Sequence, residues 1–357
     1  MVKTYQFLVT LSVFFMSALT VAGQKAHDIL FGYMANRGLI LGMAQMTPSG
    51  ARAVDPVLST IAQGYSNSEM IASALFPQVS VPVRGGKIIT FGKEDFMLYG
   101  SQRAPGENTK RVQFGYSSGN YALVDYGLEG QVPIEVLQEG QAGPGIDHAA
   151  MAVRKVSNIM ALRLEKQAAD IARTAGSYAA ANKITRSSTA QWSDLTSGVS
   201  DPINDIEAAK DAIRAATGKR PNTVVMGAQV MAKLRQHPKV VDRIKYTGRD
   251  VATAELLAAL FGVQRVLVGD AIYSNDAGSA FTDVWGKDVV VAYTELGSMA
   301  DMGAPSYGYT YTLSGYPLAE EAYYDRNTKS WVFPVTRAEA PVLASASAGY
   351  LITNAVA

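Results

Sequence analysis

The sequence predicts an α+β protein with a β-rich first segment, one long helix and a compact unit of alternating helices and strands. Three observations support this fold class. Residues 79–132 are rich in β-forming residues broken by Gly and Pro. Between Ile146 and Ala175, apolar residues recur at helical spacing. From residue 201 onward, short helical and strand patterns alternate before β character returns near the carboxyl terminus.

The composition is that of an ordinary globular protein. The 357 residues are 48% hydrophobic and 18% charged, enough chain for one large or two medium domains. Lys plus Arg number 32 and Asp plus Glu 31, so bulk charge draws the protein to neither nucleic acid nor an anionic membrane. Cysteine is absent and the three histidines lie far apart without ligand spacing. We therefore predict no metal site and no cofactor.

Residues 1–76 are predicted to form an amino-terminal arm, of which residues 1–23 are largely apolar. The apolar run from Phe7 to Gly23 is typical of a secretory signal peptide. Two other interpretations stay open: an apolar arm that packs on neighbouring subunits, and an upstream extension, because the stretch from Met43 resembles a natural start. The run has about 17 residues, the short limit for a bilayer span, and no later segment could form a second span. No membrane is expected as a partner.

A strand is predicted within residues 77–86, followed by an extended β-hairpin over residues 87–132. Two β-forming runs flank the polar stretch SQRAPGENTKR at residues 101–111, which we expect at the tip. A two-stranded ribbon is marginal alone in water, and no third strand is evident nearby. We therefore expect another subunit to supply the surface on which the hairpin lies.

Residues 133–200 contain the clearest helix, predicted over residues 146–175 with Asp147 as N-cap and Gly176 after its end. About 30 residues at 1.5 Å each make a rod of roughly 45 Å. Its apolar stripe consists of Val153, Val156, Met160, Leu164 and Ile171. The opposite face, expected to be exposed, carries Arg154, Asn158, Glu165 and Arg173.

Residues 201–300 are predicted to form an α/β unit. Asp201-Pro202 opens a helix that runs to about Thr217, and Gly218 ends it. Strands are expected at 224–226 and 265–269, and helices at 228–236 and 253–261. We interpret His237-Pro238 as a helix stop. In residues 288–357 β character returns, with a hairpin turn at Asp325-Arg326-Asn327.

Sequence motifs that resemble catalytic signatures fail in context. Gly115–Gly119 matches G-x-S-x-G, but that motif needs a helix after its serine, and a β-like run follows here. Thr217–Arg220 resembles a phosphate loop but lacks the first glycine, and its helix precedes the glycine. Adjacent carboxylates such as Glu320 and Glu321 point to opposite faces of a strand. We therefore predict no catalytic residue and no enzyme.

An ordered set of segments carries a family resemblance. ALFP precedes a GGKI strand, the long helix follows, and then come TGKRPN before a strand, HP, and VLVGDA. This order, over residues 53–354, resembles the major capsid proteins of tailed bacteriophages, which have the Hong Kong 97-type fold. The resemblance implies an amino-terminal arm, an extended loop, a peripheral domain with a spine helix (77–86, 133–200 and 301–357) and an axial domain (201–300), to which the carboxyl terminus returns.

The resemblance also implies function and partners. We expect hexamers and pentamers that form an icosahedral shell around double-stranded phage DNA, bound without sequence specificity. Because only about 50 residues precede the matching region, the resemblance implies a separate scaffolding protein. A portal protein is a further expected partner, and the sequence leaves open whether a cement protein decorates the shell. The virion capsid is the expected location, after assembly in the host cytoplasm. The candidate assembly residues are Arg103, Glu107, Lys110, Arg111, Arg154 and Arg173.

Two other functions stay open. An encapsulin-like nanocompartment shell would share the fold but package an enzyme in place of DNA. A secreted surface protein would use residues 1–23 as a signal. No motif designates Lys93 or Lys110 for a covalent crosslink between subunits, and none is predicted.

Overall fold

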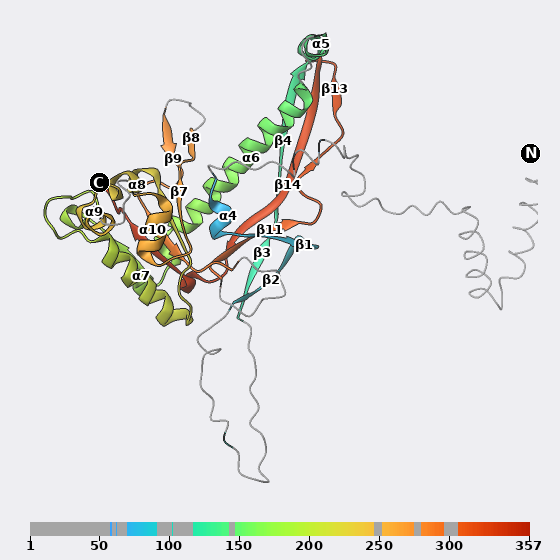
Figure 1. The fold of residues 1–357 in the computed structure, drawn as a ribbon. Helices are drawn as coiled ribbons and strands as arrows, with labels where there is room; N and C mark the ends of the chain where they lie inside the picture. Colours follow the sequence, from blue (N-terminus) through green and yellow to red (C-terminus); the bar gives the residue numbers. More distant parts are fainter. Residues whose placement is uncertain are drawn as a thin grey trace, which may run out of the picture. The chain divides into compact units, whose positions relative to one another are not determined.

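The computed structural model describes residues 58, 62, 70–90, 102, 117–142, 147–245, 252–274, 280–295 and 306–357. The chain divides into units at 1–52 and 53–357, and every described residue lies in the second unit. The apolar residues 1–23 and the predicted hairpin tip, apart from residue 102, lie outside the described residues. The described part is a mixed α and β structure, as predicted, and is drawn in Figure 1.

One six-stranded sheet, here called the β14 sheet, is built around the long strand β14 (Ser330–Leu343). β4 (Val124–Pro133) pairs with one edge of β14 over ten residues. Its other edge pairs with β11 (Gly308–Leu313), β12 (Leu318–Ala319) and β13 (Tyr323–Asp325). β1 (Gln78–Val81) runs parallel to β11 at the margin. The Asp325 carboxylate accepts hydrogen bonds from Asn327 and Thr328, which fixes the predicted hairpin turn.

β2 (Gly85–Thr90) and β3 (Ser117–Ala122) form a separate antiparallel pair, here called the β2–β3 ribbon. The two strands at the base of the predicted hairpin are therefore paired. The prediction that residues 87–132 find no further strand in their own chain is wrong for β4, which pairs with β14. That partner lies about two hundred residues further along the chain, and strand pairing at such a distance leaves no local sequence pattern.

A second, five-stranded sheet has the order β5-β15-β10-β6-β7 and is here called the β6 sheet. Its strands are β5 (Lys183–Thr185), β15 (Gly349–Thr353), β10 (Val289–Ala292), β6 (Thr223–Gly227) and β7 (Arg265–Gly269). β6 and β10 are buried throughout, which explains their nearly unbroken runs of apolar residues. β5 and β15 come from outside residues 201–300, so this sheet joins distant parts of the chain.

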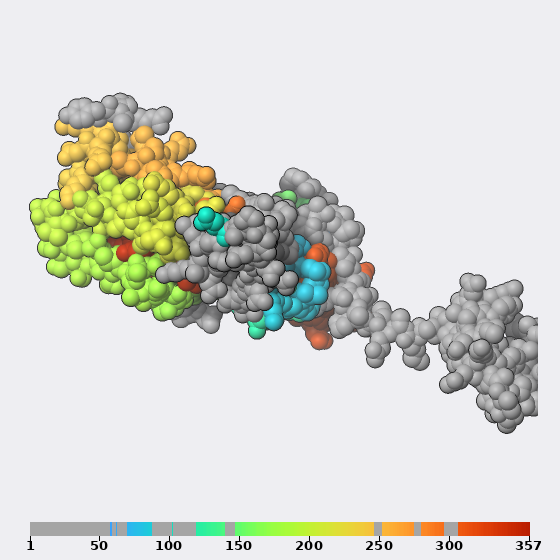
Figure 2. Space-filling model, turned by 90° about the horizontal axis from the view of Figure 1, so that it is seen from below, coloured from blue at the N-terminus to red at the C-terminus, as the bar shows by residue number. Residues whose placement is uncertain are grey.

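Four helices gather beside the β6 sheet (Figure 1): α7 (Pro202–Thr217), α8 (Ala228–Leu234), α9 (Pro238–Ile244) and α10 (Ala254–Phe261). Asp201 caps α7, and Gly218 ends it in the left-handed conformation with φ of 69°. Helix α9 was not predicted: His237-Pro238 follows the end of α8, but Pro238 also occupies the first turn of a new helix. In Figure 2, residues coloured green to orange cover most of this region, and the red carboxyl-terminal segment shows only in small patches.

The long helix α6 (His148–Arg173) lies close to the predicted bounds, and Asp147 caps it by accepting from Ala150 N at 3.0 Å. Glu165 was predicted on an exposed face, but it is buried.

Two short helices contact α6: α4 (Ala72–Leu75) and α5 (Ile134–Ala142). β8 (Ile272–Ser274) and β9 (Phe281–Asp283) form a small ribbon. Single 3-10 turns occur at Ala175–Ser177, Ala180–Asn182, Ser188–Ala190 and Ala346–Ala348.

Gly130 in β4 allows the β14 sheet to approach α6 closely. A Cβ atom at this position would lie 3.2 Å from the Ala152 Cβ and from a Val156 methyl group, tighter than ordinary van der Waals contact. Of the helices in the described ranges, none has both the length and the apolar character that a bilayer crossing requires.

Candidate functional site

Helix α6 packs against both sheets. Along its first half, Val153, Val156 and Met160 share a hydrophobic cluster with Phe333 and Val335 of the β14 sheet. Near its end, three buried alanines share another cluster with strands of the β6 sheet; they are Ala168, Ala169 and Ala172. Alanine lets the helix and the strands approach closely. α6 is therefore a rigid connection between the two sheets, and its polar contacts decide how firmly they are joined.

The Glu165 carboxylate joins three separate segments. It accepts hydrogen bonds from Ile71 N at 3.0 Å, from Ala72 N at 2.8 Å and from Trp285 Nε1 at 2.6 Å. Burial raises the pKa of Glu165 above its ordinary value, although the three hydrogen bonds favour the charged form and act against that rise. The carboxylate holds the start of α4 and the segment after β9 against α6.

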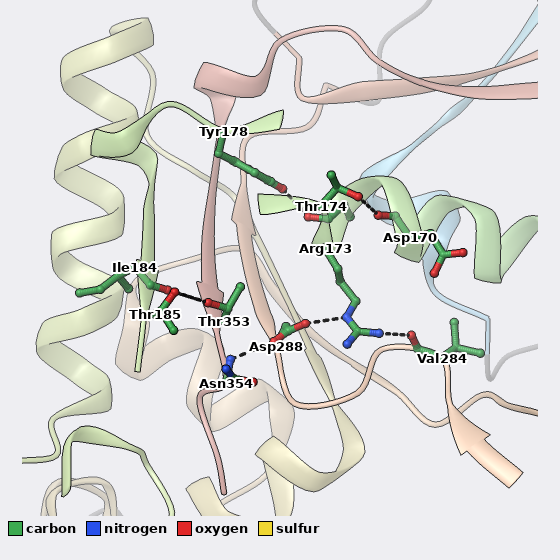
Figure 3. Close-up of polar contacts among 11 residues, drawn as sticks. Asp170, Arg173, Thr174, Tyr178, Ile184, Thr185, Val284, Asp288, Thr353 and Asn354 are labelled. Atoms are coloured by element: carbon green, nitrogen blue, oxygen red, sulfur yellow. Dashed lines mark hydrogen bonds and ion pairs between the residues drawn. The ribbon is translucent and has the colours of Figure 1, made fainter. Parts of the chain in front are cut away.

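Arg173, at the last residue of α6, is bonded within its own chain (Figure 3). Its Nε donates to Asp288 at 2.6 Å and its Nη1 donates to the carbonyl of Val284 at 3.0 Å. Asp288 also accepts from Asn354 N at 2.9 Å, just after β15. The Arg173 side chain keeps 31% exposure. Its proposed role in subunit contact stays a prediction, but its main polar contacts tie α6 to the β6 sheet.

A third buried carboxylate, Glu339 of β14, joins α6 to the β14 sheet. Arg163 donates to it at 2.8 Å, and Arg337 lies 3.7 Å away on the same strand. The Arg163 guanidinium also lies over the ring of Tyr126 in β4, 3.1 Å from its centroid. Burial raises the pKa of Glu339, and the two arginines oppose that rise. The three polar links of α6 thus reach both sheets and α4.

The structure describes two of the six predicted assembly residues, Arg154 and Arg173. Arg103, Glu107, Lys110 and Arg111 lie outside the described residues. Arg154 is exposed on α6, beside the exposed Lys155. Sequence reasoning missed the buried carboxylates of Glu165, Asp288 and Glu339. For Glu165 a signal existed: the alanines three, four and seven residues later show that the buried face of the helix widens toward its end.

Motifs set aside at the sequence level behave as structural elements. Ser117 and Ser118 belong to β3, which β4 follows without an intervening helix, so the hydrolase context is not met there. His237 is buried and its Nε2 lies 3.2 Å from the Ser200 hydroxyl. Burial and the nearby Lys239 lower the pKa of His237. Within the described ranges, no three His, Cys, Asp or Glu side chains gather in a way that could hold a metal ion.

Comparison with known proteins agrees with this architecture. The family described as Phage major capsid protein E matches residues 138–329, more than half of the chain. The major capsid protein of Burkholderia phage BcepMu is 38% identical over 310 residues, covering 86% of this chain and 98% of that protein. The major capsid protein of Pseudomonas phage JBD67 is 30% identical over 232 residues, 63% of this chain and 69% of that protein.

A solved structure is also similar. The crystal structure of a phage-related protein from Bordetella bronchiseptica RB50 shares 41% sequence identity with this chain, with a TM-score of 0.73. The similarity covers 85% of this chain and 98% of that one. The likeness therefore extends over most of both chains. Together with the matching sequences, it shows that the chain belongs to the family of phage major capsid proteins.

Proposed function

We propose that this phage major capsid protein assembles with itself into hexamers and pentamers, which close into an icosahedral shell around double-stranded DNA. The family is structural, so the functional surfaces are those between subunits. Identical subunits that contact one another through unlike surfaces form closed rings when the rotation between them closes. Shell stability then comes from many weak contacts repeated around the lattice.

The observation that carries this proposal is the β2–β3 ribbon. Among the described residues its strands pair only with each other, and a two-stranded ribbon is marginal alone in water. It is anchored where Tyr121 stacks on Tyr311 of the β14 sheet, with ring centroids 4.4 Å apart. An anchored ribbon without a third strand supports an extended loop that lies on a neighbouring subunit.

The Hong Kong 97-type plan fits these elements. In this proposal α6 is the spine helix, and the β14 sheet is the core of a peripheral domain formed by residues 77–86, 133–200 and 301–357, which β4 joins from the preceding segment. Strands β6, β7 and β10 with α7 to α10 are the core of an axial domain at residues 201–300, and β5 and β15 join its sheet from outside that range. Residues 1–76 would be the amino-terminal arm. The polar links of α6 to both sheets support a subunit that moves as one body during assembly.

Further partners follow from the same proposal. A separate scaffolding protein, a portal protein and a cement protein would contact the shell, which would assemble in the host cytoplasm. The DNA would be enclosed without sequence specificity. Because the chain has 32 basic and 31 acidic side chains, bulk charge would contribute little attraction between shell and DNA. The curated relatives are proteins of phages, which supports DNA over a packaged enzyme as the content.

Electron microscopy of the purified protein tests this proposal. Negative staining and sedimentation should reveal shells, tubes or capsomers for the wild-type chain. A variant in which a short Gly-rich turn replaces residues 91–116 should stay unassembled but keep the wild-type thermal midpoint, because β2 and β3 remain paired. Alanine at the four predicted tip positions Arg103, Glu107, Lys110 and Arg111 should weaken assembly in the same direction. A wild-type protein that stays monomeric at high concentration would contradict the proposal.

A further inference from the structure

We propose that helix α5 of one subunit docks on the exposed face of α6 in a neighbouring copy. This inference rests on the proposed shell function and names one of its subunit contacts. Two surface patches of opposite charge carry it. The first, the α6 patch, consists of Met151, Arg154, Lys155 and Ile159; the second, the α5 patch, consists of Glu135, Val136 and Glu139.

The α6 patch combines exposed apolar groups with positive charge. Met151 is 54% exposed and Ile159 is 48% exposed, although both sit on a helix whose opposite side is fully packed. They lie two turns apart, about 12 Å along the axis. Arg154 and Lys155 lie between them, both exposed. No acidic residue occurs between His148 and Leu164, so this half of α6 is purely basic.

The α5 patch has the complementary character. Glu135 and Glu139 are exposed one turn apart, about 6 Å along the helix axis. Val136 between them is 38% exposed. α5 contains no Lys or Arg, so its charge is purely acidic. Each patch therefore combines two like charges with exposed apolar groups, and the two signs are opposite.

The partners of these charges are missing within one subunit. Among the described residues, none forms an ion pair with Glu135, Glu139, Arg154 or Lys155. In its own chain α5 packs inward through Leu137, against the cluster that holds Val153 of α6. That packing turns the exposed side of α5 away from the α6 patch. The complementary charges are thus left for another molecule.

A second copy of this chain is the partner that fits, because it carries both signs. Figure 1 shows α5 beside the amino-terminal end of α6, so both patches lie near one end of the long helix. Each subunit can then present its α5 patch to one neighbour and its α6 patch to another, around an axis at which these ends meet. Such a contact joins unlike surfaces and can close into a ring.

Charge reversal tests this contact. Glu135→Lys with Glu139→Lys, and separately Arg154→Glu with Lys155→Glu, should each raise the protein concentration needed for shells about tenfold. Combining all four substitutions restores opposite signs and should return that concentration to within about threefold of wild type. The control variant Asp211→Lys with Asp242→Lys makes the same change in charge as the α5 reversal, on exposed positions of α7 and α9, and should assemble like wild type. Light scattering and negative-stain microscopy of a dilution series detect the shells and give the protein concentration at which they first form.

The absence of cysteine allows a second, direct test. A Val136→Cys chain and a Met151→Cys chain, mixed before assembly and then oxidised, should form a disulfide-linked dimer that contains one of each. Either chain assembled alone should give little dimer. In such a shell each cysteine faces the other patch of a neighbouring chain, which contains no cysteine. This result does not depend on the stability of a charge-reversed variant.

The outcomes separate this inference from the proposed function. Wild-type shells together with reversed variants that assemble like the control would overturn the α5–α6 contact and leave the shell function standing. A fourfold variant that stays as impaired as its parents, or mixed cysteine chains without a heterodimer, would also overturn it. Wild-type protein that forms no shells under any condition counts against the proposed function itself.

Discussion

Replacing Glu165 by Gln should weaken the joint between α6, α4 and the segment that carries Trp285. The carboxylate accepts three hydrogen bonds, two from main-chain N–H groups and one from an indole. An amide keeps only one acceptor oxygen, and its NH₂ group meets at least one N–H donor head-on. One donor is then buried without a partner.

The magnitude follows from these contacts. A hydrogen bond to a charged acceptor contributes about 1.5–3 kcal/mol, and an unpaired buried donor costs about 1–3 kcal/mol. The amide is easier to bury than the carboxylate, which offsets part of this loss. We expect Glu165→Gln to lower the free energy of unfolding of the unassembled subunit by about 2–3 kcal/mol. Glu165→Ala should lower it further, because all three donors lose their acceptor.

Guanidinium unfolding followed by tryptophan fluorescence measures this effect. Asp170→Asn is the matched control: it makes the same chemical change on the same helix, but Asp170 is exposed and pairs with Lys166 four residues earlier. That pair contributes at most about 0.5 kcal/mol. Combining Glu165→Gln with Trp285→Phe should cost less than the sum of the two single changes, because both remove one hydrogen bond. If the free energies of unfolding of Glu165→Gln and Asp170→Asn differ by less than about 0.5 kcal/mol, the reasoning is refuted.

Three further predictions concern the same unassembled subunit. Asp288→Asn should lower the free energy of unfolding by about 1.5–3 kcal/mol, because Arg173 and Asn354 N lose a charged acceptor. Gly130→Val should cost about 1–3 kcal/mol by forcing β4 away from α6, as measured by thermal unfolding. Burial lowers the pKa of His237 below the ordinary 6.5, so its unfolded form takes up a proton first as pH falls. The contribution of His237 to the free energy of unfolding should therefore be fully present above pH 6.5 and decrease below it. His237→Gln should make the free energy of unfolding fall less steeply with decreasing pH.

Each of these changes has a matched control on a similar element. Asp125→Asn removes an exposed carboxylate that pairs with Arg84 and should cost at most about 1 kcal/mol. Gly127→Val lies on the same strand as Gly130, but a Cβ there meets only ordinary contact at 3.5 Å. His148→Gln is the control for His237→Gln, because it makes the same substitution at the first residue of α6. Any of the three test variants that behaves like its control would contradict the corresponding argument.

Helix ends were the part of the fold that the sequence predicted best. Asp147, Asp201-Pro202 and Gly218 act through bonds to residues within four positions, so a local pattern contains the whole interaction. The pairing of β4 with β14 was not predictable in this way, because its stabilising contacts come from residues far apart in the chain. For the same reason the predicted hairpin included β4, which in the structure pairs with β14.

The polar links of α6 were predicted less well than its apolar stripe. A helix pattern assumes one buried face, but α6 contacts different sheets at its two ends, so its buried face changes along its length. Glu165 and Arg173 therefore seemed to belong to an exposed face. Arg154, at the end where only one sheet is near, is exposed as predicted.

The position of β15 has a consequence for how the subunit is made. This strand lies between β5 and β10 in the β6 sheet, although both of those neighbours precede it in the chain. During translation, β5 therefore stays separated from β10 until residues 349–353 emerge from the ribosome. A nascent chain cannot complete this sheet early, so the edge of β10 that β15 covers stays open to pairing with another chain until synthesis is nearly finished.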